Sequence, residues 1–109
     1  MGKEVVFNVP ASEILKEGKM QAIGLFKNKA VTEFPDKYVI TEKGIWLEEK
    51  GAFSAKAVFM LFSDFKNFAV MNGCFILYPK KGMTPTNIYF DDINGAFEII
   101  GKYVPKLLM

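Results

Sequence analysis

The residue types that most often carry catalysis are scarce in this chain. It contains no histidine and a single cysteine, Cys74. Without an imidazole the commonest general base at neutral pH is missing, and no serine or cysteine nucleophile can be activated by a neighbouring histidine. Cys74 lies in an apolar run beside Phe75 and Ile76, where a thiol is typically a small buried hydrophobic group. A metal site built from histidine and cysteine ligands is excluded by the same composition.

Two adjacent acidic pairs, Asp91-Asp92 and Glu48-Glu49, remain as candidates for acid–base chemistry or cation binding. The first pair directly precedes an amphipathic run and is explained as a helix cap. The second pair stands where a strand ends, and neither has the ligand spacing of a calcium loop. The three serines lack the flanking glycines of a nucleophile elbow. We therefore expect no enzyme activity, no metal and no cofactor.

The charged residues argue against nucleic-acid binding and leave one weak lipid hypothesis. All fourteen basic residues are lysines, interleaved with acids, and the net formal charge is only +2. Specific readers of nucleic acids depend on the bidentate fork of arginine and on a basic stripe. The nine glycines occur singly, so a glycine-rich phosphate loop is absent and no small-molecule substrate is indicated. Two turns could still contact anionic lipid headgroups weakly, through Lys27, Lys29, Lys80 and Lys81.

Apolar residues are more abundant than a half-exposed sheet requires. They make up 50% of the chain, and the runs 58–62 and 74–78 are apolar on both faces of the strands that they predict. Helices of the same chain can cover part of this surplus. The rest indicates a contact surface for a partner protein or for other copies of the chain. The candidate contact residues are Trp46, Phe59, Leu61 and Ile76.

The order of apolar runs and turn signals predicts an α+β domain, with the strands first and one closing helix last. Asn72-Gly73 tolerates the positive φ angles of a type I′ turn and predicts a tight hairpin. Alternation places Ile45 and Leu47 on one face of their strand and Trp46 on the other. Seven or eight strands are expected, at 20–26, 30–34, 37–41, 45–49, 57–62, 66–71, 74–78 and 86–90.

Two helices are expected at opposite ends of the chain. A short one starts with Ser12 as N-cap and is stopped by Gly18. The closing helix follows Asp91-Asp92, carries an apolar stripe as far as Val104, and ends at Pro105.

The length of 109 residues fits a single domain over 1–109, with a lead-in at 1–14, a core at 15–104 and a tail at 105–109. One cysteine cannot form an internal disulfide, which favours a reducing compartment. The N-terminus lacks the apolar core and the cleavage site of a secretory signal, and no run reaches the roughly 18 apolar residues of a membrane span. These features predict a cytoplasmic protein.

Three stretches carry a family resemblance: LKEGK at 15–19, YVITEKGIWL at 38–47, and LFSDFKNF at 61–68. With the final strand and the Asp-capped helix, they make residues 15–104 similar to the bacterial pleckstrin-homology-like domains, which are relatives of GRAM-type modules. The resemblance implies a strongly bent antiparallel sheet, or partly open barrel, of about seven strands with one C-terminal capping helix. Members of this superfamily bind phosphoinositides, peptides or proteins, and some bacterial ones resemble ring-forming assemblies.

The phosphoinositide signature of the eukaryotic members requires lysine and arginine around the first hairpin turn, and Lys27 and Lys29 match it only in part. The leading hypothesis is therefore a non-enzymatic binding or assembly module that acts through protein–protein contacts as a homo-oligomer. The alternative is a peripheral binder of anionic lipid headgroups that uses the lysine-bearing turns.

Overall fold

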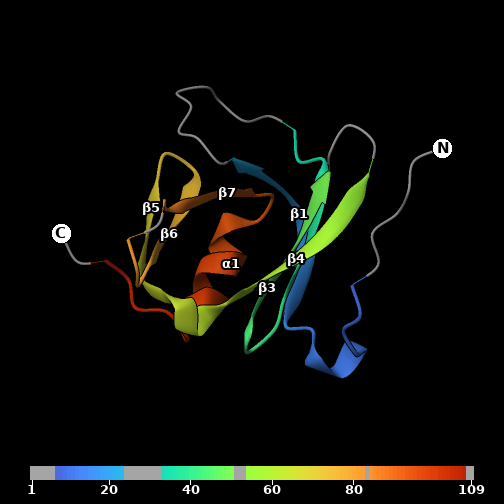
Figure 1. Cartoon of the computed structure of the whole chain (residues 1–109), viewed down its shortest axis with the longest axis horizontal. Helices are drawn as coiled ribbons and strands as arrows, with labels where there is room; N and C mark the ends of the chain where they lie inside the picture. The colour runs from blue at the N-terminus through green and yellow to red at the C-terminus, as the bar shows by residue number, and fades with distance from the viewer. Residues whose placement is uncertain (1–6, 24–32, 51–53, 83, 108–109) are drawn as a thin grey trace.

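The structure, a computed structural model, describes residues 7–23, 33–50, 54–82 and 84–107 (Figure 1). Over these residues the strands come first and the α-helix comes last, as the sequence predicts for an α+β fold. The elements are η1 (Ala11–Glu13), β1 (Lys16–Ile23), β2 (Asp36–Ile40), β3 (Gly44–Lys50), β4 (Ala55–Leu61), η2 (Phe62–Asp64), β5 (Phe65–Met71), β6 (Cys74–Pro79), β7 (Thr86–Phe90) and α1 (Ile93–Ile100).

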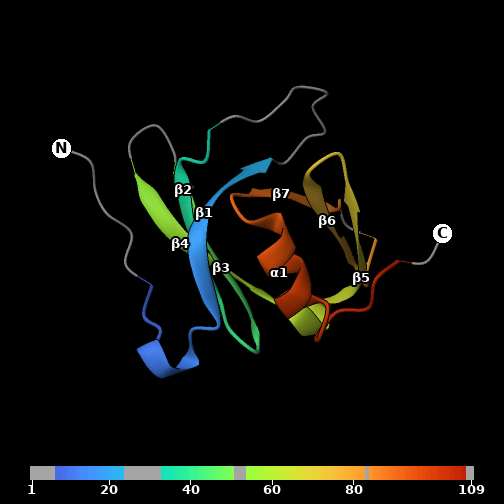
Figure 2. The same cartoon turned by 180° about the vertical axis from the view of Figure 1, so that it is seen from behind.

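The seven strands form one antiparallel sheet in the order β4-β3-β2-β1-β7-β6-β5. The sheet is strongly curled, so that β1–β4 form one wall, β5–β7 form the other, and α1 lies between them in both views (Figures 1 and 2). The two walls are joined where β1 pairs with β7. β4 and β5 stand at the two ends of the strand order and are connected by η2. The described residues therefore form a half-barrel with one α-helix.

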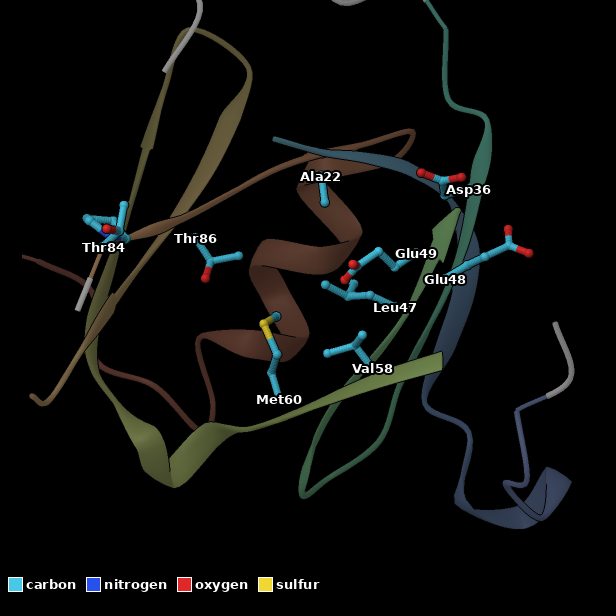
Figure 3. Close-up of a pocket in the computed structure, with 10 residues that line it drawn as sticks. Ala22, Asp36, Leu47, Glu48, Glu49, Val58, Met60, Thr84 and Thr86 are labelled. Atoms are coloured by element: carbon cyan, nitrogen blue, oxygen red, sulfur yellow. The ribbon is translucent and has the colours of Figure 1, made fainter. Parts of the chain in front are cut away.

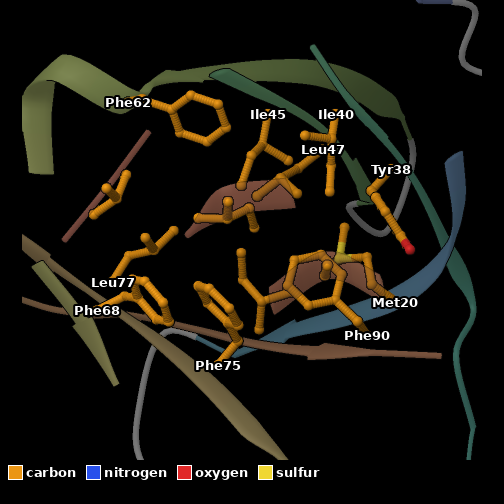
Figure 4. Close-up of a cluster of buried hydrophobic side chains, with 14 of the residues drawn as sticks. Met20, Tyr38, Ile40, Ile45, Leu47, Phe62, Phe68, Phe75, Leu77 and Phe90 are labelled. Atoms are coloured by element: carbon orange, nitrogen blue, oxygen red, sulfur yellow. The ribbon is translucent and has the colours of Figure 1, made fainter. Parts of the chain in front are cut away.

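The hydrophobic core fills the space between the two walls and α1 (Figure 4). Ile45 and Leu47 point into it from β3, as alternation predicts, and Phe75 and Leu77 point into it from β6. Burying one such side chain contributes about 1.5–3 kcal/mol. The rings of Phe68 and Phe75 stack at a centroid distance of 4.7 Å. Across the two walls, the Tyr38 ring on β2 meets the Phe90 ring on β7 at a centroid distance of 4.7 Å.

The hairpin between β5 and β6 confirms the clearest local prediction. Asn72 and Gly73 have φ angles of 52° and 76°, and Met71 pairs with Cys74 across the turn. Both central residues of a type I′ turn need positive φ, which asparagine tolerates and glycine adopts freely.

β1 begins earlier than predicted and passes through Gly18, which was expected to stop the preceding helix. A Cβ atom at Gly18 would lie 2.8 Å from Asp91 Oδ1 and 2.9 Å from Tyr38 Oη. The glycine therefore allows two side chains to approach the strand closely. A helix stop at this position is wrong.

The second predicted strand, 30–34, is only partly covered by the described residues. Residues 30–32 lie outside the described residues, and Glu33 and Phe34 belong to no strand. The total is still seven, because the runs at 74–78 and 86–90 both form separate strands.

The helix predictions are right about the start of α1 and wrong elsewhere. Asp92 caps α1, because its side chain accepts a hydrogen bond from the Gly95 N–H at 3.1 Å. The helix ends at Ile100 rather than near Val104, and the chain continues as turns that still bury Val104. At the other end, Ser12 lies inside the short η1 helix, which has no side-chain cap.

The tail after Pro105 runs beside β5. The Phe68 N–H donates to the Pro105 carbonyl at 3.0 Å, and the Leu107 N–H donates to the Phe68 carbonyl at 2.6 Å. This short parallel bridge covers part of the outer edge of β5. Among the described residues no helix is long and apolar enough to cross a bilayer.

Candidate functional site

Three of the four predicted contact residues lie together on the outer face of β3 and β4. Trp46 on β3 is directly opposite Phe59 on β4, and their ring centroids are 4.7 Å apart. Leu61 follows on the same face of β4, opposite Gly44. We call Trp46, Phe59 and Leu61 the outer β3–β4 face. The structure thus brings together three contact residues that the sequence predicts only individually.

The chain itself covers one end of this face. The Phe7 ring lies 6.1 Å from the Trp46 ring, centroid to centroid, and both Trp46 and Phe59 are partly buried. Leu61 is 42% exposed and is the most accessible of the three. Contact with another protein is therefore easiest at the Leu61 end, close to η2.

The remaining predicted residues lie elsewhere. Ile76 is on β6, in the opposite wall, and is only 8% exposed. Lys80 and Lys81 are exposed in the segment after β6, whereas Lys27 and Lys29 lie outside the described residues. The structure therefore does not bring Ile76 to the outer β3–β4 face, and it describes only half of the lysine set.

A hollow on the inner side of β4 was not anticipated. It consists of two adjoining cavities of about 500 Å³ and 510 Å³ that share Met60, Thr84 and Thr86. Figure 3 shows Leu47, Val58 and Met60 pointing into the first cavity, with Thr86 on the opposite side. We call the two cavities together the β4 trough. Sequence reasoning missed it because its walls come from segments far apart in the chain.

The two ends of the β4 trough carry opposite charges. The end near the start of β4 is lined by the carboxylates of Asp36, Glu48 and Glu49. The end beside η2 is lined by Lys80 and Lys81 together with Asp64, so its net formal charge is still positive. Glu49 Oε1 lies 3.8 Å from Lys56 Nζ, and both side chains remain more than half exposed. Such an exposed pair contributes little to stability, so both charged groups stay available for other contacts.

The acidic pair Asp91-Asp92 has a structural role, as its predicted capping function implies. Asp91 accepts hydrogen bonds from the Lys19 N–H at 3.0 Å and from the Tyr38 hydroxyl at 3.3 Å. Burial, with the adjacent Asp91 carboxylate as a second cause, raises the pKa of Tyr38. Asp92 pairs with Lys16 at 2.9 Å, and this bond together with the Gly95 N–H lowers the pKa of Asp92. These bonds tie the start of α1 to β1 and β2.

Cys74 is buried, as predicted, and burial raises the pKa of its thiol. Among the described residues, no group of three or more histidine, cysteine, aspartate or glutamate side chains could hold a metal ion.

Comparison with known proteins adds no identification. No protein-family model matches the chain, and neither the curated proteins nor the solved structures yield a match. A function of the chain must therefore be inferred from its geometry.

Proposed function

We propose that the chain is a divergent pleckstrin-homology-like domain that works as a non-enzymatic binding and assembly module. The antiparallel strand order and the single C-terminal helix support the assignment to this fold family. The main support for this function is the exposure of Leu61, a large apolar side chain that is 42% exposed beside the Trp46–Phe59 pair. In this proposal the outer β3–β4 face binds another copy of the chain.

The physical reason is the cost of leaving this face in water. Removing apolar surface from water contributes about 25 cal/mol per Å², and tryptophan anchored among apolar neighbours is enriched at the centres of protein interfaces. The Trp46 ring lies 4.7 Å from the Phe59 ring and 6.1 Å from the Phe7 ring, centroid to centroid, so its side chain has little freedom left to lose on association. A preorganised anchor of this kind favours binding.

Lipid binding is the weaker candidate. Lys80 and Lys81 are exposed near η2 and could face an anionic surface. Each lysine near such a surface contributes about 1 kcal/mol, so two give only a marginal attraction. Sedimentation with vesicles of an anionic lipid separates the two functions, because attraction by Lys80 and Lys81 falls as salt is added and burial of apolar surface does not.

Light scattering behind size exclusion, over a range of protein concentrations, tests the proposal. We expect a defined oligomer whose mass falls towards that of the monomer when Leu61→Lys places a charge in the contact. Val70→Lys is the matched control, because Val70 is 36% exposed but lies on β5 in the other wall. A monomer at every concentration, or equal effects of both substitutions, would contradict the proposal.

A further inference from the structure

We propose that the edge of β4 that faces away from β3, which pairs with no described residue and which we call the free edge, binds an extended segment of a partner protein as an added antiparallel strand, with alternate side chains of that segment filling the β4 trough. This inference rests on the proposed function as a protein-binding module and names the kind of partner that it takes. The surface is distinct from the outer β3–β4 face, because it consists of the backbone of β4 and the hollow on its inner side.

Backbone hydrogen bonds at the end of β4 show which groups face the free edge. The Phe62 N–H donates to the Lys43 carbonyl at 2.9 Å, directly beyond the pair Gly44–Leu61. In an antiparallel ladder, hydrogen-bonded and non-hydrogen-bonded pairs alternate. The pair Gly44–Leu61 is therefore not hydrogen-bonded, and Leu61 directs its N–H and C=O away from β3.

The same alternation applies along the rest of β4. Val58 and Met60 exchange hydrogen bonds with β3, whereas Ala57 and Phe59 direct their N–H and C=O groups to the free edge. The bond from the Thr41 N–H to the Gly44 carbonyl at 2.9 Å gives an independent check. It shows that Gly44 directs its carbonyl towards β2, so the pair Gly44–Leu61 is not hydrogen-bonded. An added strand would thus find donors and acceptors at Ala57, Phe59 and Leu61.

The two edges of the sheet differ in how far the described residues cover them. The edge of β5 is partly covered by the chain's own tail at Lys106. Among the described residues β4 pairs with β3 alone. Exposed edges are normally protected by charges, proline or a bulge, yet β4 has Lys56 as its only charged residue and no proline. Such an edge is suited to pairing with another strand.

The β4 trough supplies the space for the side chains of the added strand. Residues opposite Val58 and Met60 would point to the same side as these two, which line the trough. Small apolar side chains fit that floor, while the intervening residues of the segment would lie beside Ala57 and Phe59 on the outer side.

The charges at the two ends predict where an antiparallel segment carries charges of its own. β4 runs from the acidic end, at Glu49 and Asp36, to the basic end, at Lys80 and Lys81. An antiparallel segment starts at the basic end, so it should carry an acidic residue first and a basic residue last. The partner we infer is therefore an extended segment with an acidic start, alternating apolar residues and a basic end.

The first test is calorimetric titration of the unmodified chain with the synthetic peptide Asp-Thr-Val-Thr-Val-Thr-Ser-Thr-Lys, which has blocked termini. Alternation places its Asp, both valines and its Lys on the side of the β4 trough. We expect saturable binding, and about tenfold weaker binding when Asp and Lys exchange places, because both rim contacts then become repulsive. N-methylation of the second and third threonines, opposite Phe59 and Ala57, should abolish binding, since their N–H groups face β4. N-methylation of the two valines, whose N–H groups face away, should leave it unchanged. No binding at millimolar peptide, or equal effects of the two methylation patterns, would overturn the inference.

A variant of the chain provides the second test. Ala57→Pro removes an N–H that faces the free edge and leaves the β3 ladder intact, whereas Ala57→Thr keeps the N–H. We expect a tenfold or greater loss of peptide affinity for the proline variant only, with thermal unfolding as the control for folding. If the proline variant does not fold, the methylated peptides still test whether the segment pairs with the free edge of β4.

The two proposals can fail separately. If the peptide does not bind but Leu61→Lys lowers the solution mass, the edge inference fails and the assembly role stands. If the peptide binds and the chain stays monomeric, self-association fails while the edge inference stands. If Ala57→Pro itself converts an oligomer to a monomer, a second copy occupies the edge and the peptide proposal is wrong.

Discussion

Replacing Gly44 by alanine should destabilise the protein strongly, although the added group is a single methyl. Gly44 is the first residue of β3, and a Cβ atom there would overlap the Met60 carbonyl oxygen and lie 3.0 Å from Phe59 Cζ. A backbone carbonyl cannot rotate away as a flexible side chain can. The strands must separate at this end, or the Phe59 ring must leave the outer β3–β4 face.

The magnitude follows from these two consequences. Overpacking of a well-packed site costs about 1–3 kcal/mol, and loss of the neighbouring bond from the Phe62 N–H to the Lys43 carbonyl adds about 1 kcal/mol. We therefore expect a loss of about 2–4 kcal/mol in the free energy of unfolding. For a domain of this size each kcal/mol lowers Tm by about 4–8 °C.

Urea unfolding followed by tryptophan fluorescence measures the loss, because Trp46 lies next to the affected site. Gly82→Ala is the matched control, since a Cβ at Gly82 meets no atom within 4 Å. The control should be neutral or stabilising by up to about 1 kcal/mol, through lower entropy of the unfolded chain. Equal stability of the two variants would refute the steric argument.

Two further predictions concern the cap of α1 and the tail that runs beside β5. Asp92→Ala should destabilise the protein at neutral pH, because Asp92 caps α1 and pairs with Lys16. The pKa of Asp92 is lowered in the folded state, so the contribution of Asp92 to stability is present above the ordinary aspartate pKa and is lost as the pH falls through the lowered value. The free energies of unfolding of the two proteins, measured from pH 7 to pH 2, should therefore converge at low pH. A difference that stays constant over this range would contradict the prediction. A chain that stops at Val104 loses both backbone bonds between the tail and Phe68, so the Phe68 amide should exchange with solvent faster while the Phe75 amide, on β6, serves as the unchanged reference. Unaltered exchange at Phe68 would show that the tail does not protect β5 in solution.

The parts of the fold that depend on neighbouring residues could be read from the sequence. Asn72-Gly73 specifies its turn by the φ angles that these two residues allow, and Asp92 caps the helix that follows it. The outward position of Trp46 needs only the alternation of a strand. In each case the physical cause lies within a few residues of the effect.

The predictions that failed depend on contacts between distant segments. Gly18 resembles a helix stop locally, but its role comes from Asp91 and Tyr38, which reach it from β7's end and β2. The β4 trough likewise forms only when β4 meets the segment after β6. No local pattern marks either feature, because each residue involved would be unremarkable without its distant neighbour.

The seam between β1 and β7 has a consequence for how the chain folds. The other strand pairs join segments that follow each other along the chain, so these hairpins can form by short loop closures. The seam brings Ile23 to Asn87, and the bond from the Asp91 N–H to the Lys19 carbonyl at 2.9 Å closes it. Closing this long loop lowers the entropy of the chain before any core contact between the two walls can form. Substitutions at the seam and within the β5–β6 hairpin should therefore both slow refolding, because both sets of contacts are present when the two walls meet.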